Sequence, residues 1–511
     1  MLYEEIMFDS STLIRYRIFR YLMQISRESY AISQLAEDMN LNYQQAVIDL
    51  TEIDEELLEL NPQHKSILLG AGKVNCFNLS STVDEYRYYL LKKSVPFQFI
   101  IYFLNEEHPN VVDFCDTYSV SRSTVSRKME KLKAYLKQYN LRLTYTEANL
   151  VGDERLVRVM LFNLIWLGTR GIEIPFNTDL DRVEELVDGV SEFFPLSLSY
   201  FGQMEIRYFA ALYLARIQKG NFVKYDKRYD FLMKKNSYYD FDQIDALSED
   251  LNIKMTPKQR KAETSFVFFL AHYVPFYTME NEATLQQTIY DFSTRPNPIY
   301  SLNQEFLNFI KEDLFKNQPN VLDSPLVIGN LLNIGFTFYV TEQPIPNIQT
   351  LVVPAKEQEH AEYLLEQKID EFFTHAEDKD QYAFVKKVKP YMVKSYKNIL
   401  LPYYNSLEFS HKIKIGLAME HNFVLVKWVY QFLDDLRFVE TETYQSGNRY
   451  DYDLILSSSL LLKQKHPQLP VYFWDHSGGE DQLMQLYQYL RRIYNEKNLQ
   501  IHFENAEASK D

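Results

Sequence analysis

Cysteine, glycine and proline are scarce in this chain of 511 residues, which contains 2, 14 and 18 of them. The two cysteines, Cys76 and Cys115, are too few for a disulfide framework and too far apart for a paired metal-binding motif. This low usage fits a reducing cytosol. Because glycine and proline interrupt regular structure, their scarcity and the long periodic segments favour a helical protein.

Long apolar runs are also missing. The longest, such as "PFQFIIYFL" at residues 96–104, reach about half the length needed to span a bilayer. The N-terminal "MLYEEIMFDSS" has no basic region followed by an apolar stretch, as an export signal would. We therefore expect a cytoplasmic protein without a membrane partner.

Catalytic signatures are absent as well. The stretch "GAGKV" at residues 70–74 lacks the upstream glycine and the hydroxyl residue of a phosphate-binding loop. There is no H-E-x-x-H motif, no paired C-x-x-C and no G-x-S-x-G. We expect no enzyme activity, no cofactor and no metal site.

The composition indicates a folded but strongly acidic protein. Hydrophobic residues make up 46% and aromatic residues 15%, which is ample for packed interiors, and the length suggests roughly three or four domains. The formal charge is −16, so the surface as a whole should repel nucleic acids and anionic membranes. A polyanionic partner would have to bind a local cationic patch.

Such a patch lies in "SVSRSTVSRKMEKLKAYLKQ", residues 119–138. Val125, Met129, Leu132 and Leu136 follow one another at helical spacing, as on a helix that buries one face. Ser121 stands where an N-cap is needed. Between residues 111 and 142 seven cations oppose three carboxylates, a net charge of +4. Taken alone, the helix could simply be basic and solvated.

Flanking segments complete a winged helix-turn-helix. "NVVDFCDTY" (110–118) is typical of a short helix that ends in a tight turn, and "LRLTYTEANLVGD" (141–153) alternates like the two strands of a wing. The same pattern occurs at residues 30–60, where a shift of 79 residues places Ile32 on Val111 and Leu50 on Met129. Eight apolar positions match in this way, which indicates a duplicated unit.

The outward residues of the second unit are suited to DNA. Arginine can bind guanine with two hydrogen bonds, serine can contact a base or a phosphate, and lysines are typical phosphate contacts. The first unit ends in the acidic "TEIDEELLEL", so we expect the second to dominate affinity, while the first reads bases or merely packs. The candidate DNA-contacting residues are Ser121, Arg122, Ser123, Ser126, Arg127, Lys128, Lys131 and Lys133 of the second unit and Asn42, Tyr43, Gln44 and Gln45 of the first.

The tandem units, with the following "NLVGDERLVRVMLFNLIWLG" (149–168), resemble the Mga/AtxA-like regulators of Gram-positive bacteria, transcription activators associated with virulence. The resemblance implies two helical phosphotransferase-regulation domains, which the sugar phosphotransferase system can phosphorylate on histidine, and a C-terminal EIIB-like domain that tends to dimerise. Helical patterns up to about residue 401, and strands alternating with helices from His411, agree with this order.

We therefore expect a mainly α fold with five parts. They are a first winged helix-turn-helix (1–80), a second (81–153), two phosphotransferase-regulation-like helical domains (154–295 and 296–405) and an EIIB-like α/β domain (406–511). The candidate phosphorylation sites are His272, which could instead be a core residue, and His375, which could simply be exposed. The EIIB-like loop "MEHNF" (419–423) lacks the usual nucleophilic cysteine.

The expected function is that of a sequence-specific, DNA-binding transcription activator of virulence or sugar-responsive genes. Its expected partners are double-stranded DNA, a second copy bound through the C-terminal domain, and the phosphocarrier protein of the phosphotransferase system. The alternatives are a phosphorelay component, or an interaction protein that does not read DNA.

Overall fold

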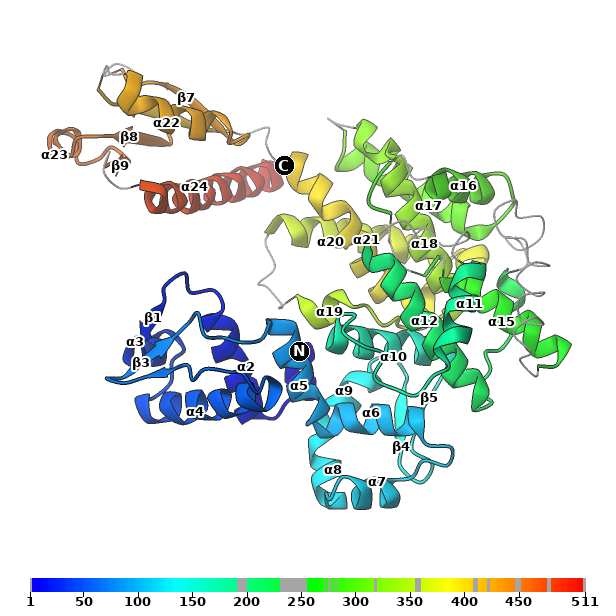
Figure 1. Cartoon of the computed structure of the whole chain (residues 1–511). Coiled ribbons are helices and arrows are strands. Elements are labelled where there is room, and N and C mark those ends of the chain that lie inside the picture. The colour runs from blue at the N-terminus through cyan, green and yellow to red at the C-terminus, as the bar shows by residue number, and fades with distance from the viewer. Residues whose placement is uncertain are drawn as a thin grey trace. The chain divides into compact units, whose positions relative to one another are not determined.

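The computed structural model consists of two compact units (Figure 1). The larger comprises Met1–Glu305, Pro325–Glu357 and Phe373–Met392, and the smaller comprises Phe306–Ser324, Gln358–Phe372 and Val393–Asp511. The structure describes residues 2–190, 200–229, 255–270, 272–273, 277–280, 283–316, 319–353, 360–407, 412–420, 423–445, 452–475 and 479–508.

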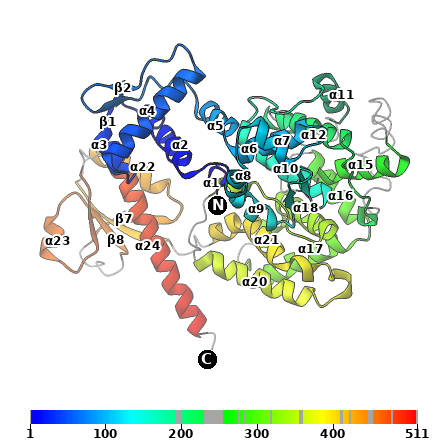
Figure 2. The ribbon, with the colours of Figure 1, turned by 90° about the horizontal axis from the view of Figure 1, so that it is seen from below.

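A first winged helix-turn-helix opens the larger unit (Figure 2). Its wing is an antiparallel sheet with strand order β1-β3-β2. The apolar stripe of its long helix is fully buried at Leu50, Ile53 and Leu57, as the spacing predicts. The elements are α1 (Tyr3–Met7), α2 (Ser10–Leu22), β1 (Ser29–Ala31), α3 (Ile32–Asp38), α4 (Tyr43–Leu60), β2 (Leu68–Leu69) and β3 (Lys73–Asn75).

The second winged unit follows directly. Its wing is the antiparallel hairpin β4–β5, and α6 and α7 both pack on α8. The elements are α5 (Val83–Lys92), α6 (Val95–Asn105), α7 (Val111–Thr117), α8 (Arg122–Lys128), α9 (Glu130–Lys137), β4 (Arg142–Thr144) and β5 (Asn149–Val151).

The turn between the two helices has the same geometry in both units. Asn40 and Ser119, which the shift of 79 residues pairs, both adopt a left-handed backbone, with φ of 54° and 52°. The next amide bonds back to the first helix in each case, from Leu41 to the Ala36 carbonyl (2.8 Å) and from Val120 to the Cys115 carbonyl (3.0 Å). The predicted duplication is confirmed at the level of individual hydrogen bonds.

One prediction for the second unit needs correction. The segment from Ser121 to Gln138 is not a single helix, because Met129 separates α8 from α9 with φ −82° and ψ −6°. The buried face nevertheless continues through the break, since Val125, Met129 and Leu132 are all buried. One continuous buried face therefore packs both short helices against the hydrophobic core.

Between residue 154 and residue 407, the regular structure of the described residues is helical. Its helices are α10 (Glu154–Thr169), α11 (Leu180–Val190), α12 (Tyr200–Gln218), η3 (Lys227–Tyr229), α15 (Pro257–Leu270), α16 (Ala283–Ser293), α17 (Pro298–Asp313), η4 (Pro319–Asp323), α18 (Pro325–Thr341), α19 (Gln349–Val352), α20 (His360–Ala376), η5 (Asp380–Tyr382) and α21 (Val385–Leu407). Helix α10 is buried along its length, so it is a central helix of the larger unit.

Buried charges join α10 to its neighbours. The Arg158 guanidinium donates to both carboxylate oxygens of Glu263 on α15, at 2.6 and 3.0 Å. Its Nε donates to Glu154, which also accepts from Arg216 of α12. The side chains of Arg158 and Glu263 are each only 1% exposed, so each charge depends on the other for compensation.

Glu205 on α12 supports a prediction about pH. Burial raises the pKa of this carboxyl to about 7, although the Arg170 guanidinium acts to lower it. An unfolded glutamate titrates near pH 4.3, so the native state retains a proton that the unfolded state releases, and stability falls as pH rises from about 4 to 7. Glu205→Gln should be about 2–3 kcal/mol more stable than the parent at pH 8 and equal to it near pH 4. Urea unfolding at both pH values measures this, and a difference independent of pH contradicts it.

The C-terminal part of the smaller unit is an α/β domain, as predicted. Its parallel sheet has the order β7-β6-β8-β9, and β8 is buried at every position, as expected for a strand covered on both faces. The elements are β6 (Ile413–Ala418), α22 (Phe423–Asp434), β7 (Val439–Thr443), β8 (Leu454–Ser457), α23 (Leu461–Lys465), β9 (Val471–Phe473) and α24 (Gly479–Ala508).

Two details of this domain differ from the expectation. Strand β7 was not predicted from the sequence; its "VETET" is charged and mostly exposed, as suits an edge strand. The pattern of "FVLVKWVYQFLDDL" (423–436) predicts one helical face that includes Trp428, Val429 and Leu433, yet Trp428 is 75% exposed. Residues 421–422 of the "MEHNF" loop lie outside the described residues. Across the parts of the chain described above, no helix is both long and apolar enough to cross a bilayer.

Candidate nucleic-acid interface

The start of α8 is fixed by its cap. The Ser121 hydroxyl accepts a hydrogen bond from the Thr124 amide at 3.1 Å, which satisfies one of the open amides of the first turn. The same hydroxyl lies 2.8 Å from Ser123 Oγ and 2.9 Å from Thr124 Oγ1. Ser121 therefore orients the helix, while the exposed Ser123 hydroxyl points outward beside it.

Free cations occupy the exposed side of α8 and α9. Arg122, Arg127 and Lys131 are exposed, opposite the buried Val125 and Leu132. No hydrogen bond or ion pair to these three side chains is found within the described ranges. Ser126 is exposed on the same helix. The sequence-predicted residues thus form one cationic surface whose charges are available to a polyanion.

Lys128 and Lys133 have partners inside the protein. Lys128 Nζ lies 3.3 Å from the Asp9 carboxylate at the start of α2. Burial acts to raise the pKa of Asp9, but hydrogen bonds from the Thr12 amide and hydroxyl and from Lys128 lower this pKa to about 2. Lys133 Nζ lies 4.5 Å from the centre of the Tyr145 ring on the wing. A phosphate would have to compete with these contacts, so both lysines are weaker candidates than Lys131.

Two cations that the sequence analysis did not single out belong to the same surface. Lys137 ends α9 and Arg142 begins the wing strand β4, and both are exposed. The wing is tied to α7 by backbone bonds, from Val111 to the Tyr145 carbonyl (3.0 Å) and from Ala148 to the Pro109 carbonyl (2.7 Å). In the sequence, Lys137 and Arg142 were indicated only by their contribution to the local net charge.

In the first unit, half of the predicted contacts serve the fold. The side-chain oxygen Oδ1 of Asn42 caps α4 by accepting a hydrogen bond from the Gln45 backbone amide at 2.7 Å. The Gln45 side chain donates to Asp49 at 3.1 Å. Tyr43 and Gln44 remain exposed. This unit therefore offers two side chains to a partner at the helix start, and neither is charged.

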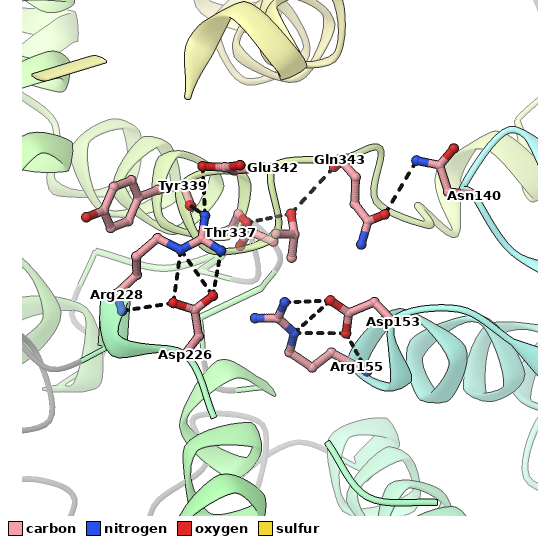
Figure 3. A network of polar contacts seen from close by, with 10 residues as sticks. Asn140, Asp153, Arg155, Asp226, Arg228, Thr337, Tyr339, Glu342 and Gln343 are labelled. Atoms are coloured by element: carbon pink, nitrogen blue, oxygen red, sulfur yellow. Dashed lines mark hydrogen bonds and ion pairs between the residues drawn. The ribbon is translucent and has the colours of Figure 1, made fainter. Parts of the chain in front are cut away.

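The second unit is anchored to the helical remainder of the larger unit (Figure 3). Asn140, just after α9, donates to the Gln343 side chain at 3.4 Å, and the Tyr135 and Tyr139 hydroxyls lie 3.3 and 3.4 Å from Thr350 Oγ1. The contacts hold the end of α9 that faces away from α8. They leave the cationic surface uncovered.

A network of polar contacts lies beside this anchor in the same view (Figure 3). Arg155 on α10 pairs with Asp153 at 2.5 Å. Arg228 pairs with Asp226 at 2.5 Å and with Glu342, at the end of α18, at 3.0 Å. The Arg228–Glu342 pair joins η3 to the residue that follows α18, next to Gln343 in the sequence.

The candidate phosphorylation sites lie in different surroundings. His272 is 3% exposed and stacks on Phe268 with ring centres 4.5 Å apart, and burial lowers its pKa to about 4. A phosphocarrier protein cannot reach a ring held in this way. His375 is exposed in the last turn of α20.

Two helices joined by a tight turn, a wing and a surface of free cations define a winged helix-turn-helix DNA-binding protein. Residues 79–165 match the Mga helix-turn-helix domain. The chain is also similar to the capsule synthesis positive regulator AcpB of Bacillus anthracis, with 19% identity over 254 residues, which is 49% of this chain and 52% of that protein. The chain thus spans about half the length of this relative. Both comparisons agree with the resemblance to Mga/AtxA-like regulators, and the matched helix-turn-helix domain includes the whole second winged unit.

Proposed function

We propose that the second winged unit inserts α8 into the major groove and reads sequence there. Arg122, Ser123 and Arg127 contact base edges, Ser126 lies beside them, and Lys131 contacts phosphate. The main observation is that Arg122 and Arg127 on the capped helix α8 and Lys131 on α9 are exposed and have no partner among the described residues, in a chain of net charge −16. Repulsion between the acidic remainder of the protein surface and the DNA phosphates then orients the protein as it approaches DNA.

A salt titration tests this proposal. Fluorescence anisotropy with genomic DNA fragments retained by the protein is measured at about 50 and 200 mM salt. With about five phosphate contacts, affinity should fall by a few hundredfold between these conditions, since each contact releases counterions. Absent or salt-insensitive binding would instead favour a phosphorelay component or an interaction protein that does not read DNA.

We further propose that the protein is a cytoplasmic activator of virulence or sugar-responsive genes. The similar protein is named a positive regulator of capsule synthesis, which supports activation and a virulence-related target. In this proposal residues 154–295 and 296–405 form two phosphotransferase-regulation-like domains. Residues 406–511 form an EIIB-like domain that pairs two copies, and the exposed Trp428, Phe473 and Met484 supply apolar surface for the pairing.

Phosphorylation by the phosphocarrier protein is expected at His375 rather than His272. Incubation with phosphocarrier protein and a radiolabelled phosphate donor should label the parent and His272→Ala, and should leave His375→Ala unlabelled. The reason is access, because His375 is exposed and His272 is buried. Labelling that persists in His375→Ala, or a parent that takes up no label, contradicts the expectation.

A further inference from the structure

The outward face of α4 is the geometric counterpart of the cationic surface of the second unit. The shift of 79 residues pairs Gln44 with Ser123, Ile48 with Arg127 and Glu52 with Lys131. The helix caps obey the same pairing, since Asn42 caps α4 as Ser121 caps α8. The two positions that carry cations in the second unit are therefore apolar and acidic in the first, at Ile48 and Glu52.

This face combines apolar side chains with carboxylates. Ile48 and Leu58 are 52% and 53% exposed, and the Glu52 side chain is 48% exposed while it pairs with Arg15 at 2.5 Å. Glu55 is exposed between them, without a hydrogen bond or ion pair to any residue that the structure describes. In a DNA groove these carboxylates would oppose phosphates. The face fits a cationic protein surface instead.

Such a surface exists on the same chain. Arg127, Lys131 and Lys137 follow one another along α8 and α9 at intervals of four and six residues, and Ile48, Glu52 and Leu58 follow one another along α4 at the same intervals. The aliphatic stems of arginine and lysine can cover Ile48 while their charged ends reach the carboxylates. Within one chain Ile48 and Arg127 are both exposed, so the two faces do not cover each other, and pairing requires a second copy.

We propose that α4 of one copy docks on the α8–α9 surface of a second copy. Two-fold symmetry allows the contact to form twice, so that each DNA-reading helix is covered by the partner. DNA and self-association then compete for the same cations, and free protein is held in a non-binding form until DNA displaces α4. The competition with DNA rests on the proposed function, in which the same cations bind DNA. The contact between the two copies can be measured without DNA.

Three double variants of the full chain test the contact. The acidic-face variant carries Ile48→Lys and Glu55→Lys, and the cationic-face variant carries Arg127→Glu and Lys131→Glu. A matched control carries Tyr290→Lys and Glu185→Lys, the same charge change at exposed positions of α16 and α11. Sedimentation velocity at about 50 mM salt, where charge screening is weak, follows the self-association of each variant and of the two face variants mixed.

The two face variants should each self-associate at least tenfold more weakly than the parent, because only the proposed C-terminal pairing then holds two copies together. Their mixture should recover association, because each opposed pair of faces regains opposite charges. The control should match the parent, and higher salt should weaken the parent's association. Unchanged association in either face variant, or a mixture that fails to recover it, overturns the proposal.

DNA binding separates this inference from the proposed function. The acidic-face variant keeps α8 intact and should bind DNA at least as well as the matched control. The cationic-face variant should lose DNA binding if the proposed function is correct. If that variant still binds DNA, the proposed reading helix is wrong, whatever the sedimentation result. If it loses DNA binding while all variants sediment like the parent, only the α4 contact is wrong.

Discussion

Replacing both Arg127 and Lys131 by alanine should lower DNA affinity by at least about 100-fold at physiological salt. A bidentate arginine–base contact contributes about 1–3 kcal/mol, and each lost phosphate contact also removes released counterions. Both side chains are exposed on the cationic surface, so their removal should leave folding intact. The slope of log affinity against log salt concentration should decrease by about one, because the lysine makes one phosphate contact. Anisotropy titrations across several salt concentrations measure both quantities.

A matched pair of substitutions controls for overall charge. Lys224→Ala with Lys258→Ala removes two exposed cations of the larger unit that lie outside the winged units. This control should change affinity by less than about threefold, because charges beyond a Debye length are largely screened. Equal losses in both double variants would mean that net charge, rather than the α8–α9 surface, governs binding.

Arg158→Ala should remove about 3–5 kcal/mol from the first unfolding transition. The substitution leaves the Glu263 carboxylate buried without its bidentate partner, and Glu154 loses one of its two arginines. Breaking one side of a buried ion pair has a cost of this size, because the remaining charge cannot reach water. Urea unfolding followed by tryptophan fluorescence measures the change. Arg158→Met with Glu263→Leu should recover much of the lost stability, because neither member of the pair then leaves an unpaired buried charge.

An exposed pair of the same chemistry is the control. Arg207 and Glu184 form an ion pair at 2.7 Å, with side chains 48% and 47% exposed. Arg207→Ala should cost less than about 1 kcal/mol, because water solvates the remaining carboxylate. Similar losses for Arg158→Ala and Arg207→Ala would show that burial does not set the energy of the α10–α15 contact.

Several features of the reading units could be predicted from the sequence because they depend on neighbours in the chain. A cap such as Ser121 bonds an amide three residues later, and the buried stripe repeats every three or four residues. The break at Met129 was not predictable in this way, since the apolar spacing runs through it and only the packing around it shows where the helix bends. The edge strand β7 was missed because its exposed carboxylates resemble a loop.

For the candidate interface, the sequence by itself determined the tandem units, their common turn and the surplus of cations on the second one. All three follow from local spacing and residue type. Only the tertiary structure decided which charges are free, because the relevant partners are distant in the chain. Asp9 engages Lys128 across 119 residues, while no described side chain engages Arg127 or Lys131. The burial of His272 and the exposure of Trp428 were decided in the same way, since helical spacing gives a side chain its direction but does not determine what will cover it.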